Sequence, residues 1–179
     1  MYRYFNISTW ISGICCVVLM EDEIKKWINE FASVHNETLG QIPCPYAKNA
    51  LVKYVETDSI AESLADTKNN WSDDVEVVCL YTATENYTPW MLTRLVEIFN
   101  SEAMHEDIVA LEDHPLNEEI INGTKMNFGQ CSLVLVQRLS KINKASNILK
   151  EKGYYKNWSK ENLDDVVNWR FDELFVRKD

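Results

Sequence analysis

The sequence contains none of the short motifs that identify the large nucleotide-binding, hydrolase and kinase classes. It has no glycine-rich phosphate loop, no serine nucleophile elbow and no kinase signature. It also has no Cys-x-x-Cys and no paired Cys/His spacing, which are the usual patterns of zinc sites and dithiol redox centres. No repeat, low-complexity stretch or internal linker divides the chain. We therefore assign no metal ligands, and the sequence names no cofactor.

Basic residues are also scarce. The chain has 18 Lys and Arg against 28 Asp and Glu, giving a formal net charge of -10. Nucleic-acid surfaces need clustered Lys and Arg to neutralise phosphates, and anionic membranes repel an acidic protein. The lysines that do gather, at positions 141, 144, 150 and 152, fit one solvated helix face. We expect a small-molecule ligand and no nucleic acid; the oligomeric state stays open.

Cysteine usage points to a reducing compartment. The five cysteines stand at positions 15, 16, 44, 79 and 131, an odd number without a disulfide framework. We therefore expect a soluble, cytoplasmic protein. Cys79 lies in a strand-like run and is interpreted as a small buried hydrophobe.

Long hydrophobic runs are absent. The longest apolar stretch, 10–19, is interrupted by Ser12 and Gly13 and is too short to span a bilayer. Residues 1–19 are interpreted as a non-native leader, a signal-like or anchoring segment, or an extra packed element. We favour translation from Met20, because the acidic residues that follow it are typical of a helix start. Residues 20–179 are predicted to form a single globular domain, with no membrane contact expected unless residues 1–19 anchor it.

Hydrophobic periodicity predicts alternating helices and strands. Apolar residues at helical spacing predict an amphipathic helix over 20–34. Ser59, and Thr88 followed by Pro89, are typical helix starts. Strands are predicted over 50–56, 75–82, 108–111 and 132–136, a loop with an Asn122-Gly123 turn over 114–129, and two final helices, the second capped by Ser159. The tryptophans at 71, 90, 158 and 169 are expected to fill or cover the core.

These elements predict an α+β fold. We expect a mixed sheet of about four strands packed with helices, as a single layer or a sandwich, with an α/β arrangement as the alternative.

The segment 42–48, Ile-Pro-Cys-Pro-Tyr-Ala-Lys, is the most distinctive part of the sequence. Two prolines fix the backbone direction around Cys44. Three interpretations stand: the thiol packs in a loop; Lys48, four residues on, lowers its pKa; or backbone amides at a helix start near Pro45 bind a ligand.

Cys-Pro-Tyr resembles the opening of the glutaredoxin active site. The second cysteine of that family is replaced by Ala47, and a long helix precedes the thiol where glutaredoxins have a strand. A dithiol redox enzyme is therefore not expected, whereas a monothiol redox protein remains an alternative.

The segment is also similar to Cys-Pro-Phe-Ala-Lys in an uncharacterised bacterial family, domain of unknown function 1415. Trp27, the residues 44–48, His114-Pro115, Asn122 and Arg138 stand in an order similar to that family's, over most of residues 24–150. The family's Asn-Arg-x-Pro-Tyr-Pro segment is replaced by residues 127–132. The resemblance implies a fold and a site but no activity.

The residue types at these positions allow a chemical hypothesis. His114 at a strand end can direct its imidazole into a cleft as an acid or base. Arg138 at a strand-to-helix junction can bind a carboxylate or phosphate bidentately, or simply pair with a neighbouring acid.

We predict that the protein binds a small anionic molecule, with Cys44, Lys48 and His114 as catalytic candidates. Tyr46, Asn122 and Arg138 are the ligand-binding candidates. One form of the hypothesis is an enzyme with Cys44 as nucleophile; the alternatives are a non-catalytic interaction or scaffold protein and the monothiol redox protein.

Overall fold

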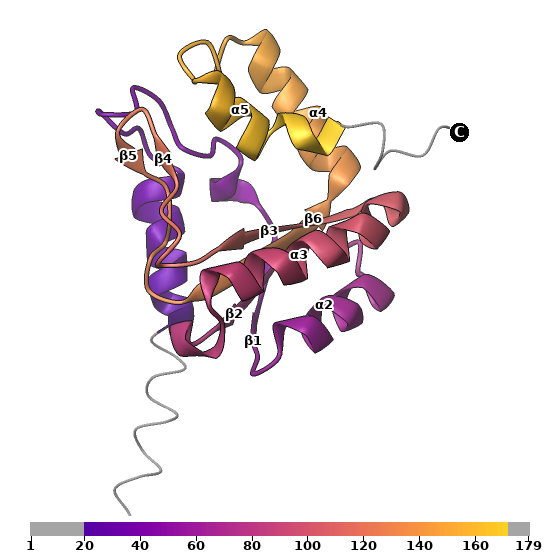
Figure 1. Cartoon of the computed structure of the whole chain (residues 1–179). Coiled ribbons are helices and arrows are strands. Elements are labelled where there is room, and N and C mark those ends of the chain that lie inside the picture. The colour runs from indigo at the N-terminus through magenta and orange to yellow at the C-terminus, as the bar shows by residue number, and fades with distance from the viewer. Residues whose placement is uncertain (1–19, 172–179) are drawn as a thin grey trace, which may run out of the picture.

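The computed structural model describes residues 20–171, in which helices cover both faces of one central sheet (Figure 1). In chain order the elements are a helix over 20–27, the π-helix η2 (Ile28–Ala32), η3 (Ala47–Asn49), β1 (Val52–Glu56), α2 (Ile60–Asn69), β2 (Val77–Thr82), η4 (Thr84–Asn86), α3 (Pro89–Ala103), η5 (Met104–Glu106), β3 (Ile108–Asp113), β4 (Ile120–Ile121), β5 (Thr124–Lys125), β6 (Ser132–Arg138), α4 (Leu139–Glu151), α5 (Lys160–Val166) and η6 (Asn168–Phe171).

The sheet is mixed and has the strand order β1-β2-β6-β3. β1 and β2 are parallel, whereas β6 runs antiparallel to both of its neighbours, β2 and β3. The last strand of the sequence therefore lies between two earlier ones. This arrangement confirms the predicted mixed four-strand sheet packed with helices.

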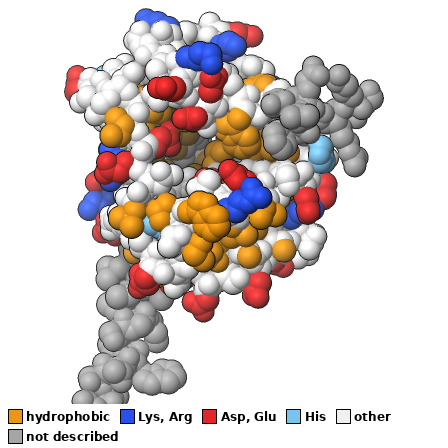
Figure 2. All heavy atoms as spheres, viewed as in Figure 1, with side chains coloured by type: hydrophobic (Ala, Val, Ile, Leu, Met, Phe, Trp, Pro, Cys, Tyr) orange, Lys and Arg blue, Asp and Glu red, His pale blue; other side chains and the backbone are white. Residues whose placement is uncertain are grey.

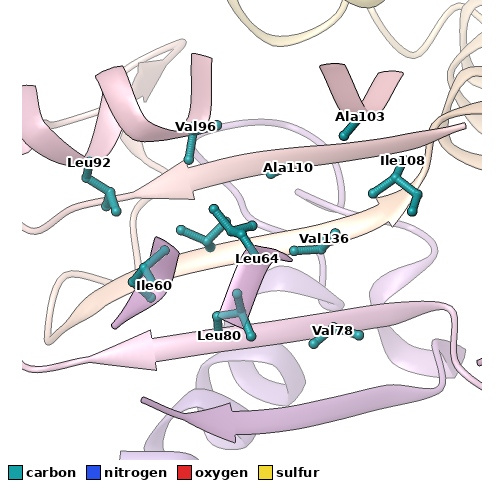
Figure 3. Close-up of a cluster of buried hydrophobic side chains, with 11 residues drawn as sticks. Ile60, Leu64, Val78, Leu80, Leu92, Val96, Ala103, Ile108, Ala110 and Val136 are labelled. Carbon is teal, nitrogen blue, oxygen red and sulfur yellow. The ribbon is translucent and has the colours of Figure 1, made fainter. Parts of the chain in front are cut away.

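The first core lies between the sheet and the helices α2 and α3 (Figure 3). Alternate strand residues point to one face, so Val78 and Leu80 of β2 and Val134 and Val136 of β6 share this side. Ile60 and Leu64 of α2 and Leu92 and Val96 of α3 pack onto them, and all eight are buried. These residues explain why α2 and α3 lie on the same face.

The opposite face is covered by the N-terminal helix at one end and by α4 and η6 at the other. Ile24 and Trp27 pack with Cys79, Tyr81 and Leu133, which are strand residues of the other parity. Farther along, Val109 of β3, Leu139 of α4 and Trp169 of η6 form a smaller cluster with Met104. The sheet thus has one helical layer on each side.

The free edge of β3 is closed by a side chain of α3. The amide nitrogen of Asn100 donates to the carbonyl of Ala110 at 2.9 Å, and the Ala110 N–H donates to the Asn100 side-chain oxygen at 2.8 Å. Both residues are buried. Asn100 therefore replaces the hydrogen bonds that a further strand would make.

Most helix ends lie where the sequence predicts them. The side chains of Ser59, Thr88 and Ser159 accept hydrogen bonds from backbone N–H groups of the first turns of α2, α3 and α5. The predicted 20–34 helix instead ends at Ala32 in a π-helical turn, and the predicted 114–129 loop contains the short β4–β5 hairpin.

The prediction that Trp90 fills or covers the core is wrong. Its side chain is 74% exposed. On α3 it shares a stripe with the exposed residues Arg94, Glu97 and Ser101, while Leu92 and Val96 face the sheet. None of the helices within 20–171 is long and apolar enough to cross a membrane.

Candidate functional site

The Cys44 loop is fastened at both sides. The Cys44 N–H donates to the carbonyl of Ala32, at the end of η2, at 2.7 Å. The Tyr154 hydroxyl, in the turn after α4, lies 2.7 Å from the carbonyl oxygens of both Ile42 and Pro43, which share its single proton. The loop is therefore held against a segment more than 100 residues later in the chain.

The environment of Cys44 favours the neutral thiol. Cys44 is exposed at the surface, and desolvation by the surrounding protein raises the pKa of its thiol. Hydrogen bonds from the backbone of Tyr46 and Ala47 lower this pKa, but the burial outweighs them. Lys48 follows in η3, a short 3₁₀ turn, and does not contribute to the shift. A raised pKa of Cys44 does not support an activated thiolate.

We expect Cys44 to react with iodoacetamide only at higher pH than an ordinary thiol, whose pKa is about 8.5. The reaction should be followed by peptide mass spectrometry from pH 6 to 11, so that Cys44 is separated from the other cysteines. Lys48→Ala should leave the midpoint unchanged. A midpoint below 8 that rises in Lys48→Ala would restore the thiolate hypothesis.

His114 has a structural role in the loop after β3. Its ring is 2% exposed, and Nδ1 accepts the backbone N–H of Leu116 at 3.1 Å. Nε2 lies 2.8 Å from the carbonyl of Tyr87, which assigns the ring proton to Nε2. Both nitrogens are therefore engaged with the backbone, and neither is available to a substrate.

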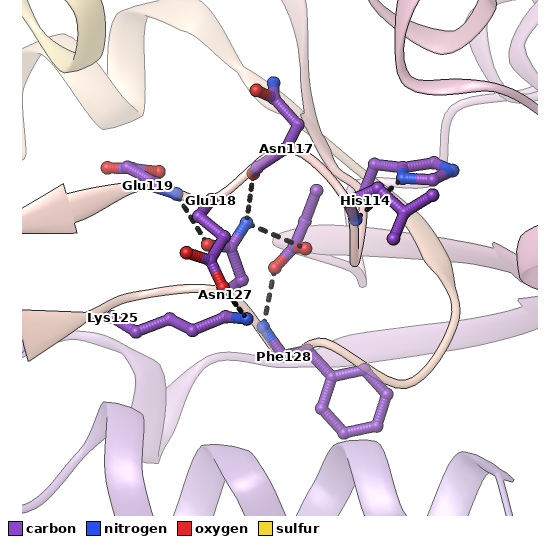
Figure 4. A network of polar contacts seen from close by, with 9 residues as sticks. His114, Asn117, Glu118, Glu119, Lys125, Asn127 and Phe128 are labelled. Carbon is purple, nitrogen blue, oxygen red and sulfur yellow. Dashed lines mark hydrogen bonds and ion pairs between the residues drawn. The ribbon is translucent and has the colours of Figure 1, made fainter.

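The neighbouring carboxylate of Asp113 organises the same loop (Figure 4). It accepts hydrogen bonds from the backbone of Phe128 at 2.8 Å and from the side-chain amide of Asn127 at 3.3 Å. Burial raises the pKa of Asp113 in spite of these bonds. The network fixes the loop that returns the chain to β6.

Asn122 and Arg138 lie apart from His114. Asn122 is exposed and, with φ of 49°, forms the turn of the β4–β5 hairpin together with Gly123. Arg138 stacks on Trp71 at 5.1 Å from the ring centroid and lies 3.6 Å from Asp73.

The register of β3 and β6 puts Arg138 at the opposite end of the sheet from His114. Arg138 pairs with Ile108, whereas His114 directly follows Asp113, which pairs with Leu133. At 3.3 to 3.4 Å per residue, the two ends are roughly 17 Å apart. His114 and Arg138 therefore do not converge on one site, whereas Cys44, Tyr46 and Lys48 lie together in one loop.

A different arginine has the properties predicted for Arg138. Arg170 of η6 is only 2% exposed, and one of its terminal nitrogens donates to the hydroxyl of Ser146 on α4 at 3.1 Å. The other guanidinium nitrogens, Nε and Nη1, have no hydrogen-bond partner within the part of the chain that the structure describes. Burial lowers the pKa of Arg170 to about 10. A guanidinium so deeply buried with two unpartnered nitrogens is uncommon, because each lost hydrogen bond is costly.

Tyr155 connects this arginine to the Cys44 loop. Burial raises the pKa of Tyr155, a hydrogen bond with Ser146 and the charge of Arg170 lower it, and Cys44 and Tyr46 raise it again. Both Arg170 and the Cys44 loop therefore lie within electrostatic reach of its hydroxyl. The ring packs edge-on against Tyr154 at 4.9 Å and against Trp158 at 5.1 Å.

We name the residues Ser146, Tyr155 and Arg170 the arginine cluster. The sequence held a signal for it that our prediction did not use. Arg170 follows Val166 and Val167 at helical spacing, so it stands on an apolar face where a charge needs a partner.

No group of three or more His, Cys, Asp or Glu side chains that could hold a metal ion occurs within residues 20–171. Comparison of the chain with models of protein families, with curated proteins and with solved structures gave no match. The resemblance to domain of unknown function 1415 therefore stays a prediction, and the function has to be argued from the site itself.

Proposed function

We propose that this protein binds a small anion, a carboxylate or a phosphate, at the arginine cluster beside the Cys44 loop. One observation carries the proposal: the buried guanidinium of Arg170 has two nitrogens without a hydrogen-bond partner among residues 20–171. The predicted role of an anion-binding arginine thus passes from Arg138, which already has Asp73, to Arg170.

The energetics favour an anionic ligand over a neutral one. A buried charge without a counter-charge destabilises the folded state, and an anion in contact with it removes that penalty. Nη2 has a second N–H besides the one that it donates to Ser146, and this N–H runs parallel to an N–H of Nε or of Nη1. Either pair matches the two oxygens of a carboxylate or phosphate. The hydroxyls of Ser146 and Tyr155 lie next to it and supply further donors.

The Cys44 loop forms the border of this site. Tyr154 holds the loop carbonyls, and Cys44 and Tyr46 lie near enough to Tyr155 to affect its titration. Tyr46 is 44% exposed, so it can move without unpacking a core. In this proposal the ligand enters past the Cys44 loop. The neutral Cys44 thiol lines the anion site and takes no part in catalysis.

Anion binding should raise the melting temperature. At a free anion concentration of one hundred times Kd, linkage adds about 2.7 kcal/mol, or about 5–10 °C for a chain of this size. We expect such a shift with phosphate, or with a dicarboxylate such as succinate, at constant ionic strength with chloride as reference. Differential scanning fluorimetry measures it directly.

Arg170→Met should abolish the shift. Arg94→Met is the matched control, because Arg94 is an exposed arginine paired with Glu97. Equal shifts in both variants would mean that the anions act elsewhere, and no shift in the unmodified protein with either anion would refute the proposal.

The monothiol redox alternative has a separate test. Incubation with glutathione disulfide followed by peptide mass spectrometry would detect a mixed disulfide at Cys44. The raised pKa of this thiol predicts little modification at pH 7.5.

A further inference from the structure

The helical layer opposite the arginine cluster carries an open groove between α2 and α3. The groove has a volume of about 270 Å³ and is lined mainly by apolar atoms. Its walls are Ala61, Leu64 and Ala65 of α2 and Leu95, Ile98 and Phe99 of α3, with Lys68 and Glu102 at one end. Ala61 and Ala65 have small side chains and leave the space above Leu64 open, which forms the groove between the two helices.

Large apolar side chains extend this groove onto the exposed face of α3. Met91 is 46% exposed and Ile98 51%. Met91, Leu95 and Ile98 follow one another at helical spacing and form a continuous stripe along the groove. Figure 2 shows hydrophobic side chains gathered over this part of the surface. Contiguous apolar surface of this kind marks interaction sites more often than chance exposure.

The rim of the groove is acidic. Glu62 and Asp66 lie on the outer side of α2, and Glu102 lines the groove on α3. The two cations nearby are already engaged, Lys68 with Glu106 at 2.8 Å and Arg94 with Glu97 at 3.0 Å. Glu62, Asp66 and Glu102 have no ion-pair partner within residues 20–171. The surface thus combines an apolar floor with uncompensated negative charge.

We propose that a basic amphipathic helix of a partner protein docks into the α2–α3 groove. Its apolar face would cover Met91, Leu95 and Ile98, and its Lys or Arg residues would pair with Glu62, Asp66 and Glu102. The stretch of α3 from Trp90 to Glu102 is about 18 Å long, which matches about three turns of the partner helix.

The negative charge of the groove favours a basic partner over a second copy of the chain. Two copies joined by this face would bring the same carboxylates together, in a protein whose net charge is already -10. A basic helix meets the same surface with opposite charge. The inference is independent of anion binding, since the groove and the arginine cluster lie on opposite faces of the sheet.

The test uses the full chain and a designed probe. The probe is a fluorescein-labelled 18-residue peptide with leucine at i, i+3, i+4 and i+7 spacing and lysine at the other positions. Its acidic twin has glutamate in place of every lysine. We expect the basic peptide to bind at 150 mM salt, as measured by fluorescence anisotropy, and the acidic twin not to bind.

Two variants separate docking in the groove from general attraction of a basic peptide to an acidic protein. Ile98→Lys adds a positive charge inside the groove, and Leu51→Lys adds the same charge at an apolar residue that is 61% exposed before β1. We expect Ile98→Lys to weaken binding at least tenfold and Leu51→Lys to weaken it less than threefold, with unchanged melting temperatures.

Equal weakening by both variants would overturn the proposal. So would a concentration-dependent dimer, seen by analytical ultracentrifugation, that Ile98→Lys dissociates, because the groove would then be a contact between two copies of this chain.

Discussion

Replacing Arg170 with methionine is expected to raise the free energy of unfolding by about 1–4 kcal/mol when no anion is added. The guanidinium is 2% exposed and two of its nitrogens have no partner among the described residues 20–171, so the folded protein bears the cost of a buried charge that the unfolded chain does not. Methionine fills a similar volume without that cost. Urea unfolding monitored by circular dichroism measures the difference.

The same variant should lose its advantage when the ligand is present. Saturating phosphate or succinate, whichever binds, should stabilise the unmodified protein and leave the stability of Arg170→Met unchanged. With the anion present, the unmodified protein should therefore become as stable as the variant or more stable. Arg94→Met, at an exposed salt bridge, should change stability by less than about 1 kcal/mol. A marked loss of stability in Arg170→Met would show that a carboxylate of the protein already neutralises this arginine.

Asn100→Ala is expected to destabilise the fold by about 2–6 kcal/mol. The substitution removes both hydrogen bonds to Ala110 and leaves a buried N–H and a buried C=O unsatisfied, at about 1–3 kcal/mol each. Asn69→Ala, at an exposed position of α2, is the matched control and should stay within about 0.5 kcal/mol. Equal effects of the two substitutions would contradict the role given to Asn100.

A second measurement separates the loss of edge protection from the loss of stability. An unpaired β3 edge is a template for further strands, so Asn100→Ala should aggregate in dilute urea at concentrations where an equally destabilised core variant, such as Leu80→Ala, does not. Light scattering at matched free energies of unfolding tests this. Similar scattering by the two variants would mean that Asn100 stabilises the protein without protecting its edge.

The elements that the sequence predicted well are those with local signals. Ser59 and Thr88-Pro89 start helices because their side chains reach N–H groups three residues later, a relation contained within one turn. The strand order follows from pairing between distant segments. Nothing near β6 in the sequence indicates that it lies between β2 and β3.

The candidate site was predicted less well for the same reason. Cys44 and Tyr46 were recognised because prolines flank the thiol, a feature of five consecutive residues. Their neighbours Tyr154, Tyr155 and Arg170 come from the other end of the chain. Arg138 and His114 looked available in the sequence, and their partners, Trp71 and Tyr87, became visible only in three dimensions.

The position of β6 in the sheet has a consequence for synthesis of the protein. β2 and β3 have no contact with each other across the sheet until residues 132–138 join them. A nascent chain that ends before Ser132 therefore has unpaired strand edges and an unfinished first core. Folding of this protein therefore has to wait until most of the chain has left the ribosome.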